Sequence, residues 1–274
     1  MAISRAQLLK ELLPGLNALF GMEYARYDDE HSEIYETESS DRSFEEEVKL
    51  SGFDAAPVKD EGSAISYDAA QESFTARYNH ETIAMGFAIT EEAMEDNLYD
   101  SLSARYTKAL ARAMAHTKQV KSVVPLNNGF TASYQGGDGV NLFTAVIQIG
   151  KWTDERGLMI AARPQTLIIP PDLQFVATRV MKSELRPGTA DNDINAVRSM
   201  GVVPGGTVVN HFLTDTDAWF LLTDIPNGMK HFNRVALETS MDGDFDTGNV
   251  RYKARERYSF GVSDPLGIWG SPGA

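Results

Sequence analysis

Hydrophobic and charged residues alternate along the segment 250–262, the pattern of a β-strand that buries one face. The apolar face comprises Val250, Tyr252, Ala254, Tyr258, Phe260 and Val262, together with Glu256. The opposite face carries Arg251, Lys253, Arg255 and Arg257. Like charges on alternate positions repel one another unless acidic groups lie across from them. We therefore expect an acidic surface to contact this face; a row of solvated charges and a weak nucleic-acid contact are the alternatives.

A long helix is predicted to follow Thr90, whose hydroxyl can cap the first free amides, with Glu91 and Glu92 at the positive end of the helix dipole. Apolar residues then recur at four-residue steps, namely Met94, Leu98, Leu102, Tyr106, Leu110 and Met114, flanked by Ala109 and Ala113. Pro125 and the Asn127-Asn128-Gly129 turn end the pattern. Roughly thirty residues at 1.5 Å each give a helix of about 45 Å, which would span a subunit.

Strand alternation also appears before this helix, in 44–50 and again in 74–89, and the connection 55–71 is rich in Asp, Gly, Ser and Ala. This pattern predicts a long hairpin with a polar tip. An isolated two-stranded hairpin is marginally stable in water. We expect it to lie against another surface, either the core of its own chain or another subunit.

The remaining segments mix short strands and helices. Residues 1–42 are polar apart from a short amphipathic helix, 8–16, which Pro14 and Gly15 should interrupt. The segment 131–165 resembles a loop and contains the apolar stretch 146–149. A buried strand (166–169), a helix (173–181), two strands (208–212 and 219–222) and a turn at Pro226-Asn227-Gly228 follow. Interleaved strands and helices with a hairpin-rich end indicate the α+β class.

Composition narrows the function classes. The 274 residues are 42% hydrophobic and 23% charged, as in ordinary globular proteins, and no apolar run approaches the eighteen residues of a membrane span. The chain has no cysteine, which excludes disulfides, thiolate nucleophiles and zinc fingers and suits a reducing cytoplasm.

The net charge of −14 is unevenly distributed: the first 100 residues hold 23 acids and 7 bases, and the remainder holds 16 acids and 18 bases. This balance argues against a general nucleic-acid binder. It is typical of a solvated acidic surface, and the alternative is that the acidic part and the basic strand face contact each other. We take Glu45, Glu46 and Glu47 of the hairpin as the acidic candidates.

Motifs for catalysis or metal binding are weak. The five histidines are scattered, and the sequence has no P-loop, Gly-x-Ser-x-Gly or Gly-x-Gly-x-x-Gly motif. The segment 242–253 begins like a calcium loop but has Thr247 and Lys253 where Gly and Glu are needed. Asp246-Thr247-Gly248 matches the aspartic-protease triplet once, so a homodimeric hydrolase would be required to supply the second carboxylate. We expect an acidic turn here, with no metal, no cofactor and no enzyme activity.

The order of arm, long hairpin, spine helix and mixed α+β remainder resembles the major capsid proteins of tailed bacteriophages, which have the Hong Kong 97 (Johnson) fold. The resemblance extends over nearly the whole chain and is carried by six segments: 13–21, 89–93, 124–130, 164–171, 257–262 and 264–271. An encapsulin-like compartment has the same fold and is the alternative within this architecture.

The resemblance implies an N-terminal arm (1–42), an E-loop hairpin (43–90), a peripheral domain with the spine helix (91–165), an axial domain (166–227) and peripheral C-terminal strands (228–274). It implies hexamers and pentamers that close an icosahedral shell around double-stranded DNA. The chain opens at the arm, so we expect a separate scaffolding protein, with a portal and a candidate decoration protein as further partners and no membrane.

The resemblance also implies a location in the virion after assembly in the host cytoplasm. Members of the family usually have a longer loop after 139–143, so we expect residues to be missing near 141–146. Lys59, near the hairpin tip, is expected to be an ordinary exposed lysine and not a cross-linking residue.

Overall fold

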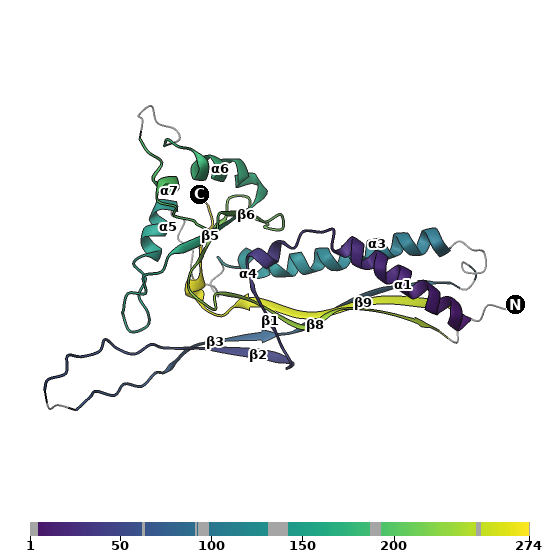
Figure 1. The fold of residues 1–274 in the computed structure, drawn as a ribbon, viewed down its shortest axis with the longest axis horizontal. Coiled ribbons are helices and arrows are strands. Elements are labelled where there is room, and N and C mark those ends of the chain that lie inside the picture. Colours follow the sequence, from purple (N-terminus) through teal and green to yellow (C-terminus); the bar gives the residue numbers. More distant parts are fainter. Residues whose placement is uncertain are drawn as a thin grey trace.

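The computed structural model describes residues 5–61, 64–90, 92, 99–130, 142–186, 193–244 and 248–273. Figure 1 shows an elongated molecule with a long sheet covered by two helices, a second sheet with short helices at one end, and a hairpin that projects from the side. The predicted α+β class is confirmed. Among the described residues, no helix is long and apolar enough to cross a membrane.

The large sheet has the strand order β1-β8-β9-β4, formed by β1 (Glu36–Ser39), β8 (Met229–Gly243), β9 (Val250–Val262) and β4 (Glu81–Ile89). Strand β1 runs parallel to β8, and the other neighbours are antiparallel. The alternation predicted for β9 is confirmed, because Val250, Tyr252 and Ala254 are buried while the intervening residues are exposed. Two helices, α1 (Arg5–Tyr24) and α3 (Tyr99–Ser122), lie along the buried face.

Helix α1 is longer than predicted because it continues through Pro14 for 20 residues. A proline inside a helix costs about 3 kcal/mol through the lost hydrogen bond and the ring clash. Pro14 is exposed, whereas Leu16 and Phe20 are 6% and 2% exposed and pack with Leu110 of α3 and the buried face of β9. Burying two such side chains contributes about 1.5–3 kcal/mol each, which outweighs the penalty.

Helix α3 confirms the spine, although its buried face differs from the prediction. Tyr106 is 50% exposed and Ala109 is exposed. Of the predicted stripe, Leu110 and Met114 are buried as expected, and the rest of the buried face is formed by Ser103, Thr107, Ala111, Ala115, Gln119 and Ser122. Thr90, the predicted cap, is described and exposed, whereas 91 and 93–98, which include most of the predicted first turn, lie outside the described residues. The helix ends where predicted, before the short α4 (Val124–Asn127) that contains Pro125.

The second sheet has the order β10-β7-β5-β6, formed by β10 (Ile268–Ser271), β7 (Trp219–Thr223), β5 (Pro164–Ile169) and β6 (Thr207–Val209). Its helices are α5 (Leu142–Ile149), α6 (Gln174–Lys182) after the turn η2 (Pro171–Leu173), and α7 (Ala196–Ser199). The predicted strands at 166–169 and 219–222 and the 173–181 helix are confirmed, whereas the strand predicted over 208–212 ends at Val209. The loop prediction for 142–149 is wrong, because Ala145 and Ile149 pack as a helix in the core under this sheet.

The hairpin consists of β2 (Phe44–Leu50) and β3 (Glu72–Asn79), which pair antiparallel and enclose the connection 51–71. The next strand, β4, pairs along its length with β9 and belongs to the large sheet. Strand β8 was absent from the prediction, although Val235, Leu237 and Met241 alternate with Glu238 and Ser240 in the sequence.

The two sheets are joined where the turn before β8 meets the turn η3 (Pro265–Gly267). Asn227 adopts a positive φ of 60°, as the predicted Pro226-Asn227-Gly228 turn requires. The backbones of Gly228 and Gly267 touch, so that a Cβ on Gly267 would lie 2.2 Å from the Cα of Gly228. Ser263 N donates to Gly228 O (2.9 Å) and Asp264 N to Asn227 O (2.9 Å).

Candidate functional site

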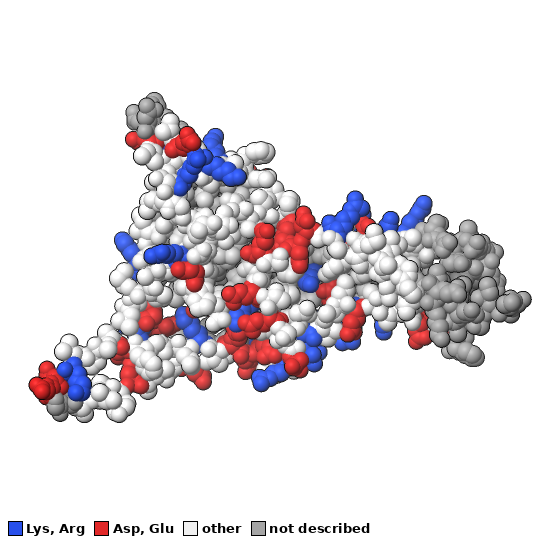
Figure 2. Space-filling view, in the orientation of Figure 1, with Lys and Arg blue, Asp and Glu red and all other residues white. Residues whose placement is uncertain are grey.

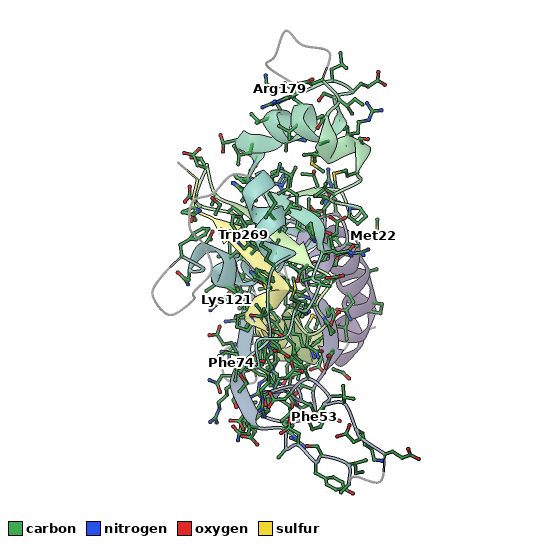
Figure 3. The ribbon with its side chains drawn as sticks, turned by 90° about the vertical axis from the view of Figure 1, so that its left-hand side faces the viewer. Met22, Phe53, Phe74, Lys121, Arg179 and Trp269 are labelled. Carbon is green, nitrogen blue, oxygen red and sulfur yellow. The ribbon has the colours of Figure 1, made fainter. Side chains whose placement is uncertain are left out.

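The most distinctive surface is the projecting hairpin, which carries apolar side chains that its own chain does not bury. Figure 1 shows that its tip extends beyond both sheets, and Figure 3 shows Phe53 on this extension, far from Trp269 in the core of the second sheet. The exposed fractions reach 94% for Val58 and 88% for Tyr67, and Leu50, Phe53 and Ile65 are also exposed. The prediction of a polar tip is therefore wrong in part, because the connection also exposes large apolar side chains. Exposed apolar patches of this kind mark interaction surfaces.

The base of the hairpin is attached to the large sheet through a buried lysine. Lys230 of β8 is 4% exposed, and its ammonium donates to Glu38 of β1 (2.8 Å) and Glu47 of β2 (2.5 Å). Burial by itself lowers the pKa of Lys230, but the two carboxylates outweigh it and raise the pKa above its usual value. One cation therefore joins three strands from three parts of the chain.

The other predicted acidic residues also have partners within the chain. Glu45 accepts a hydrogen bond from the Ser40 hydroxyl (2.7 Å), and Glu46 lies 3.4 Å from the Arg77 guanidinium of β3. Figure 2 shows acidic side chains gathered over the middle of the molecule, where β1 and the hairpin meet the large sheet. Among the described residues, no ion pair joins Glu45, Glu46 or Glu47 to the basic row of β9.

The predicted basic row lies on the face of β9 that points away from the helices. Arg251, Lys253 and Arg255 are exposed, whereas Arg257 is partly buried. The Nε of Arg257 is buried and has no hydrogen-bond partner in the described part of the chain. Contact between this row and another copy stays a prediction.

Acidic residues that face this row come from β8, the strand that the sequence prediction missed. Asp242 lies directly opposite Arg251 and Glu238 directly opposite Arg255, while Lys253 faces the neutral Ser240. Arg251 also pairs with Asp244 (2.5 Å). On the other side, the β4 residues opposite the row are small and neutral: Thr82, Ala84, Gly86 and Ala88. The expected repulsion is thus relieved within the chain at two of the four positions, and Lys253 has no facing acid in either strand.

A second buried charge cluster holds α1 and the following segment against the large sheet. Glu256 of β9 is 2% exposed, accepts a hydrogen bond from Tyr24 (3.1 Å) and lies 3.5 Å from the Lys118 ammonium. Burial and the neighbouring Glu256 carboxylate raise the pKa of Tyr24 strongly. The Glu256 carboxylate therefore has two partners inside the subunit.

Two histidines pack edge to face beside this cluster. His31, in the short helix η1 (Glu30–Glu33), lies with its ring centroid 5.1 Å from that of His231, which stacks on Phe260 at 4.3 Å. His31 lies 2.5 Å from Asp29, and this contact holds the pKa of the Asp29 carboxyl below its usual value. Burial, with the nearby His31 and Lys118, lowers the pKa of His231 to about 3. His231 is therefore neutral at physiological pH.

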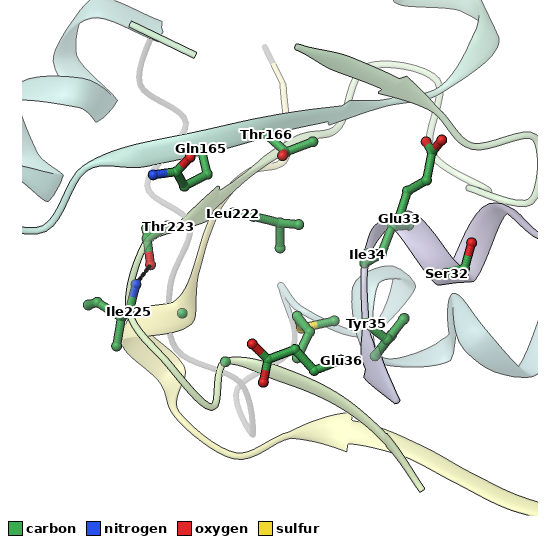
Figure 4. A pocket seen from close by; sticks show the side chains of 13 residues that line it. Ser32, Glu33, Ile34, Tyr35, Glu36, Gln165, Thr166, Leu222, Thr223 and Ile225 are labelled. Atoms are coloured by element: carbon green, nitrogen blue, oxygen red, sulfur yellow. Dashed lines mark hydrogen bonds between the residues drawn. The ribbon is translucent and has the colours of Figure 1, made fainter. Parts of the chain in front are cut away.

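A polar pocket of about 280 Å³ lies at the junction of the two sheets (Figure 4). Glu33 and Glu36 line one side, and Gln165, Thr166 and Thr223 line the other. The Thr223 hydroxyl donates to Leu266 O (2.7 Å), so one wall is fixed by the connection between β9 and β10. The pocket separates the N-terminal segment from the second sheet.

The described residues contain no group of three or more His, Asp or Glu side chains arranged to hold a metal ion. Asp246 and Thr247 of the candidate protease triplet lie outside the described residues, as do 131–141, which include part of the suspected gap near 141–146. Lys59 is exposed. The sequence prediction missed Lys230, Lys49 and Arg156, because isolated cations carry no pattern that identifies their partners.

Comparison with known proteins places this arrangement in context. The family model for phage capsid protein matches residues 73–270. No curated protein matches the chain. A virus-like particle from Pyrococcus furiosus is similar in structure, with a TM-score of 0.61 and 11% identity over 95% of this chain and 99% of that chain.

Two phage structures are also similar. That of Mycobacterium phage Che8 has a TM-score of 0.51 and 19% identity over 85% of this chain and 86% of the other. The capsid of Myoviridae phage XM1 has a TM-score of 0.55 and 10% identity over 88% and 89%. At these identities the likeness concerns the fold, and it extends over 85–95% of this chain.

Proposed function

The chain belongs to the phage capsid protein family and is a structural shell protein, and we propose that its copies form the hexamers and pentamers of an icosahedral phage head around double-stranded DNA. Its fold is Hong Kong 97-like, as the resemblance in the sequence implied. The observation that carries the proposal is the hairpin, whose exposed apolar tip, with Val58 94% and Tyr67 88% exposed, requires a second chain to cover it.

In this proposal residues 1–42 form the arm and 43–90 the E-loop region, the large sheet with α3 is the peripheral domain, and the second sheet is the axial domain. The pairing of strands supports two changes to the expected domain borders. Strand β4 (Glu81–Ile89) pairs with β9 and would belong to the peripheral domain, and β10 (Ile268–Ser271) pairs with β7 and would belong to the axial domain.

We propose that the basic row of β9 contacts an acidic part of a neighbouring copy. Lys253 is the best candidate for the centre of this contact, because it is exposed and faces only Ser240 and Gly86 within its own sheet. Glu45, Glu46 and Glu47 remain the proposed acidic side. Glu46 is the most accessible of the three, since it is exposed whereas Glu45 and Glu47 are partly buried.

The further partners of the proposal are a separate scaffolding protein, a portal, a decoration protein and the packaged DNA. The chain is a component of the virion capsid, and we propose that assembly occurs in the host cytoplasm without a membrane. No residue is assigned a catalytic role. The encapsulin-like compartment is not better supported than the viral shell.

Expression of the full chain, alone and with its neighbouring genes, followed by negative-stain electron microscopy tests the proposal. Closed shells or capsomer rings are expected, and their diameter separates a viral head from a small compartment. Monomers or dimers under every condition, including with a candidate scaffold present, would contradict the shell function.

A further inference from the structure

We propose that Arg156 is the positioning residue of the hairpin and fixes the direction in which it leaves the subunit. Arg156 belongs to a loop, 152–160, that we call the Asp154 turn. This turn lies between α5 and β5 of the second sheet, yet it contacts the root of a hairpin about 100 residues earlier in the sequence. The inference concerns what sets the geometry of the hairpin, which the family match leaves open.

The Asp154 turn is internally rigid. Asp154 N donates to Leu158 O (2.8 Å), and the Asp154 carboxylate accepts from the amides of Arg156 (2.9 Å) and Leu158 (2.8 Å). Gly157 supplies the positive φ of 82° that the turn needs. At its base, Ile160 N donates to Trp152 O (3.0 Å), and Trp152 packs against the core of the second sheet. The turn therefore has a fixed position relative to that sheet.

Arg156 joins both legs of the hairpin just beyond the end of their strand pairing. The ladder between β2 and β3 ends at Leu50 and Glu72. Farther out, the Arg156 guanidinium donates from Nη1 to Asp54 Oδ1 (3.3 Å) on the first leg and from Nη2 to Ala69 O (3.0 Å) on the second. The planar fork of a guanidinium suits two acceptors at once, which a lysine ammonium does not reproduce.

A second set of contacts fixes the same turn to the strands. Lys49 of β2 lies 3.0 Å from Glu155 and 3.1 Å from Asp264, at the connection between the two sheets. Burial acts to lower the pKa of Lys49, but hydrogen bonds to these carboxylates outweigh it and raise the pKa. Gly52 comes so close to the turn that a Cβ there would lie 3.2 Å from the Asp154 carboxylate. The hairpin root is thus held from two sides.

These contacts affect the direction of the hairpin more than the stability of the folded chain. The side chains of Arg156 and Asp54 are 23% and 64% exposed, and pairs of this kind contribute about 0–1 kcal/mol. Their effect is magnified by length, because the seven residue steps from Ser51 to Val58 reach at most about 25 Å when extended. A rotation of about 10° at the root would then move the tip by about 4 Å, enough to separate two apolar surfaces.

The chain has no cysteine, so a pair of introduced cysteines can be labelled selectively. Spin labels at Val58→Cys on the tip and Phe175→Cys on α6, which are 94% and 84% exposed, report the tip position by pulsed electron paramagnetic resonance. Labelled chains diluted into unlabelled ones give distances within one subunit. We expect a narrow distribution that becomes at least about twofold broader in Arg156→Gln.

Three comparisons separate positioning from a general structural effect. Arg163→Gln removes an equal charge from an exposed residue near the turn and should leave the distribution narrow. Arg156→Lys should give an intermediate width. At 1 M salt, where the screening length is about 3 Å, the native distribution should broaden while that of Arg156→Gln stays the same. An unchanged distribution in Arg156→Gln would overturn the inference.

The consequence for assembly rests on the proposed shell function, and the two can fail separately. Arg156→Gln should keep the thermal stability of the native chain but yield open or irregular assemblies. If the native chain forms no shells, the shell function fails while the distance measurement still decides the role of Arg156. If the distribution broadens and the shells remain regular, Arg156 does not position the hairpin for assembly.

Discussion

Arg255 of β9 lies directly opposite Glu238 of β8 in the large sheet. Cross-strand pairs of opposite charge stabilise a sheet by about 0.2–1 kcal/mol, and like charges in the same positions destabilise it. Reversing Arg255 would therefore disturb both the fold and any contact with another copy. A charge reversal at Arg257 would also disturb the fold, because this residue is partly buried.

Lys253 separates these two effects, because it faces Ser240 and Gly86 and no acid. We expect Lys253→Glu to leave the free energy of unfolding within about 0.5 kcal/mol of the native value. Shell assembly, followed by light scattering, should slow or stop, and Lys253→Gln should have a smaller effect. Normal assembly of Lys253→Glu would remove the proposed contact between the basic row and a neighbouring acidic surface.

Lys230→Met should loosen the attachment of the hairpin, because it leaves Glu38 and Glu47 side by side without their cation. The carboxylates are 47% and 25% exposed, so we expect a loss of about 1–3 kcal/mol, between the values for exposed and buried pairs. Denaturant unfolding measures the loss. In a double-mutant cycle, Glu47→Gln should cost clearly less in the Lys230→Met background than alone; strictly additive effects would show that Lys230 and Glu47 do not interact.

Strand β9 was predictable because one of its faces is buried and the other exposed, so residues such as Tyr252 and Lys253 alternate. Strand β8 begins with four consecutive buried residues, Met229 to Phe232, and its alternation appears only later. Helix α5 is a short apolar run, which periodicity cannot distinguish from a buried strand or loop. The basic row was found for the same reason as β9. Its facing acids Glu238 and Asp242 were not, because they lie on the missed strand.

Stability should fall on mild acidification because of His231. Burial, with His31 and Lys118 nearby, lowers the pKa of His231 to about 3. Between about pH 6.5 and that value, the unfolded chain therefore binds a proton at this residue that the folded chain does not bind. The contribution of neutral His231 to the free energy of unfolding is intact above about pH 6.5 and declines by about 1.4 kcal/mol per pH unit below it. Chemical denaturation between pH 7.5 and 5.5 should show this slope.

The variant His231→Phe retains an aromatic ring for the stack on Phe260 and cannot titrate. Its unfolding free energy should therefore depend less on pH over this range. The same slope in both proteins would assign the acid sensitivity to other groups, of which His80 is one, since burial and Arg257 lower its pKa as well.

Gly267→Ala should weaken the junction of the two sheets, because its methyl group would overlap the Gly228 backbone at 2.2 Å. We expect a loss of about 1–3 kcal/mol in unfolding free energy, typical of overpacking. Gly21→Ala on the exposed face of α1 has no atom within 4 Å and serves as the matched control. It should stabilise the chain by up to about 1 kcal/mol through helix propensity. Equal stability of the two variants would show that the junction can separate at little cost.

The exposed apolar tip of the hairpin should make shell assembly depend on temperature. Burial of Phe53, Val58, Ile65 and Tyr67 against a neighbouring copy would be driven by the release of ordered water, a force that is entropic near 25 °C and weakens on cooling. Shells held together by this contact should form more readily at 30 °C than at 4 °C. Chilling should accordingly release subunits from loosely joined assemblies. Replacing Val58 and Tyr67 with serine should remove most of this dependence on temperature.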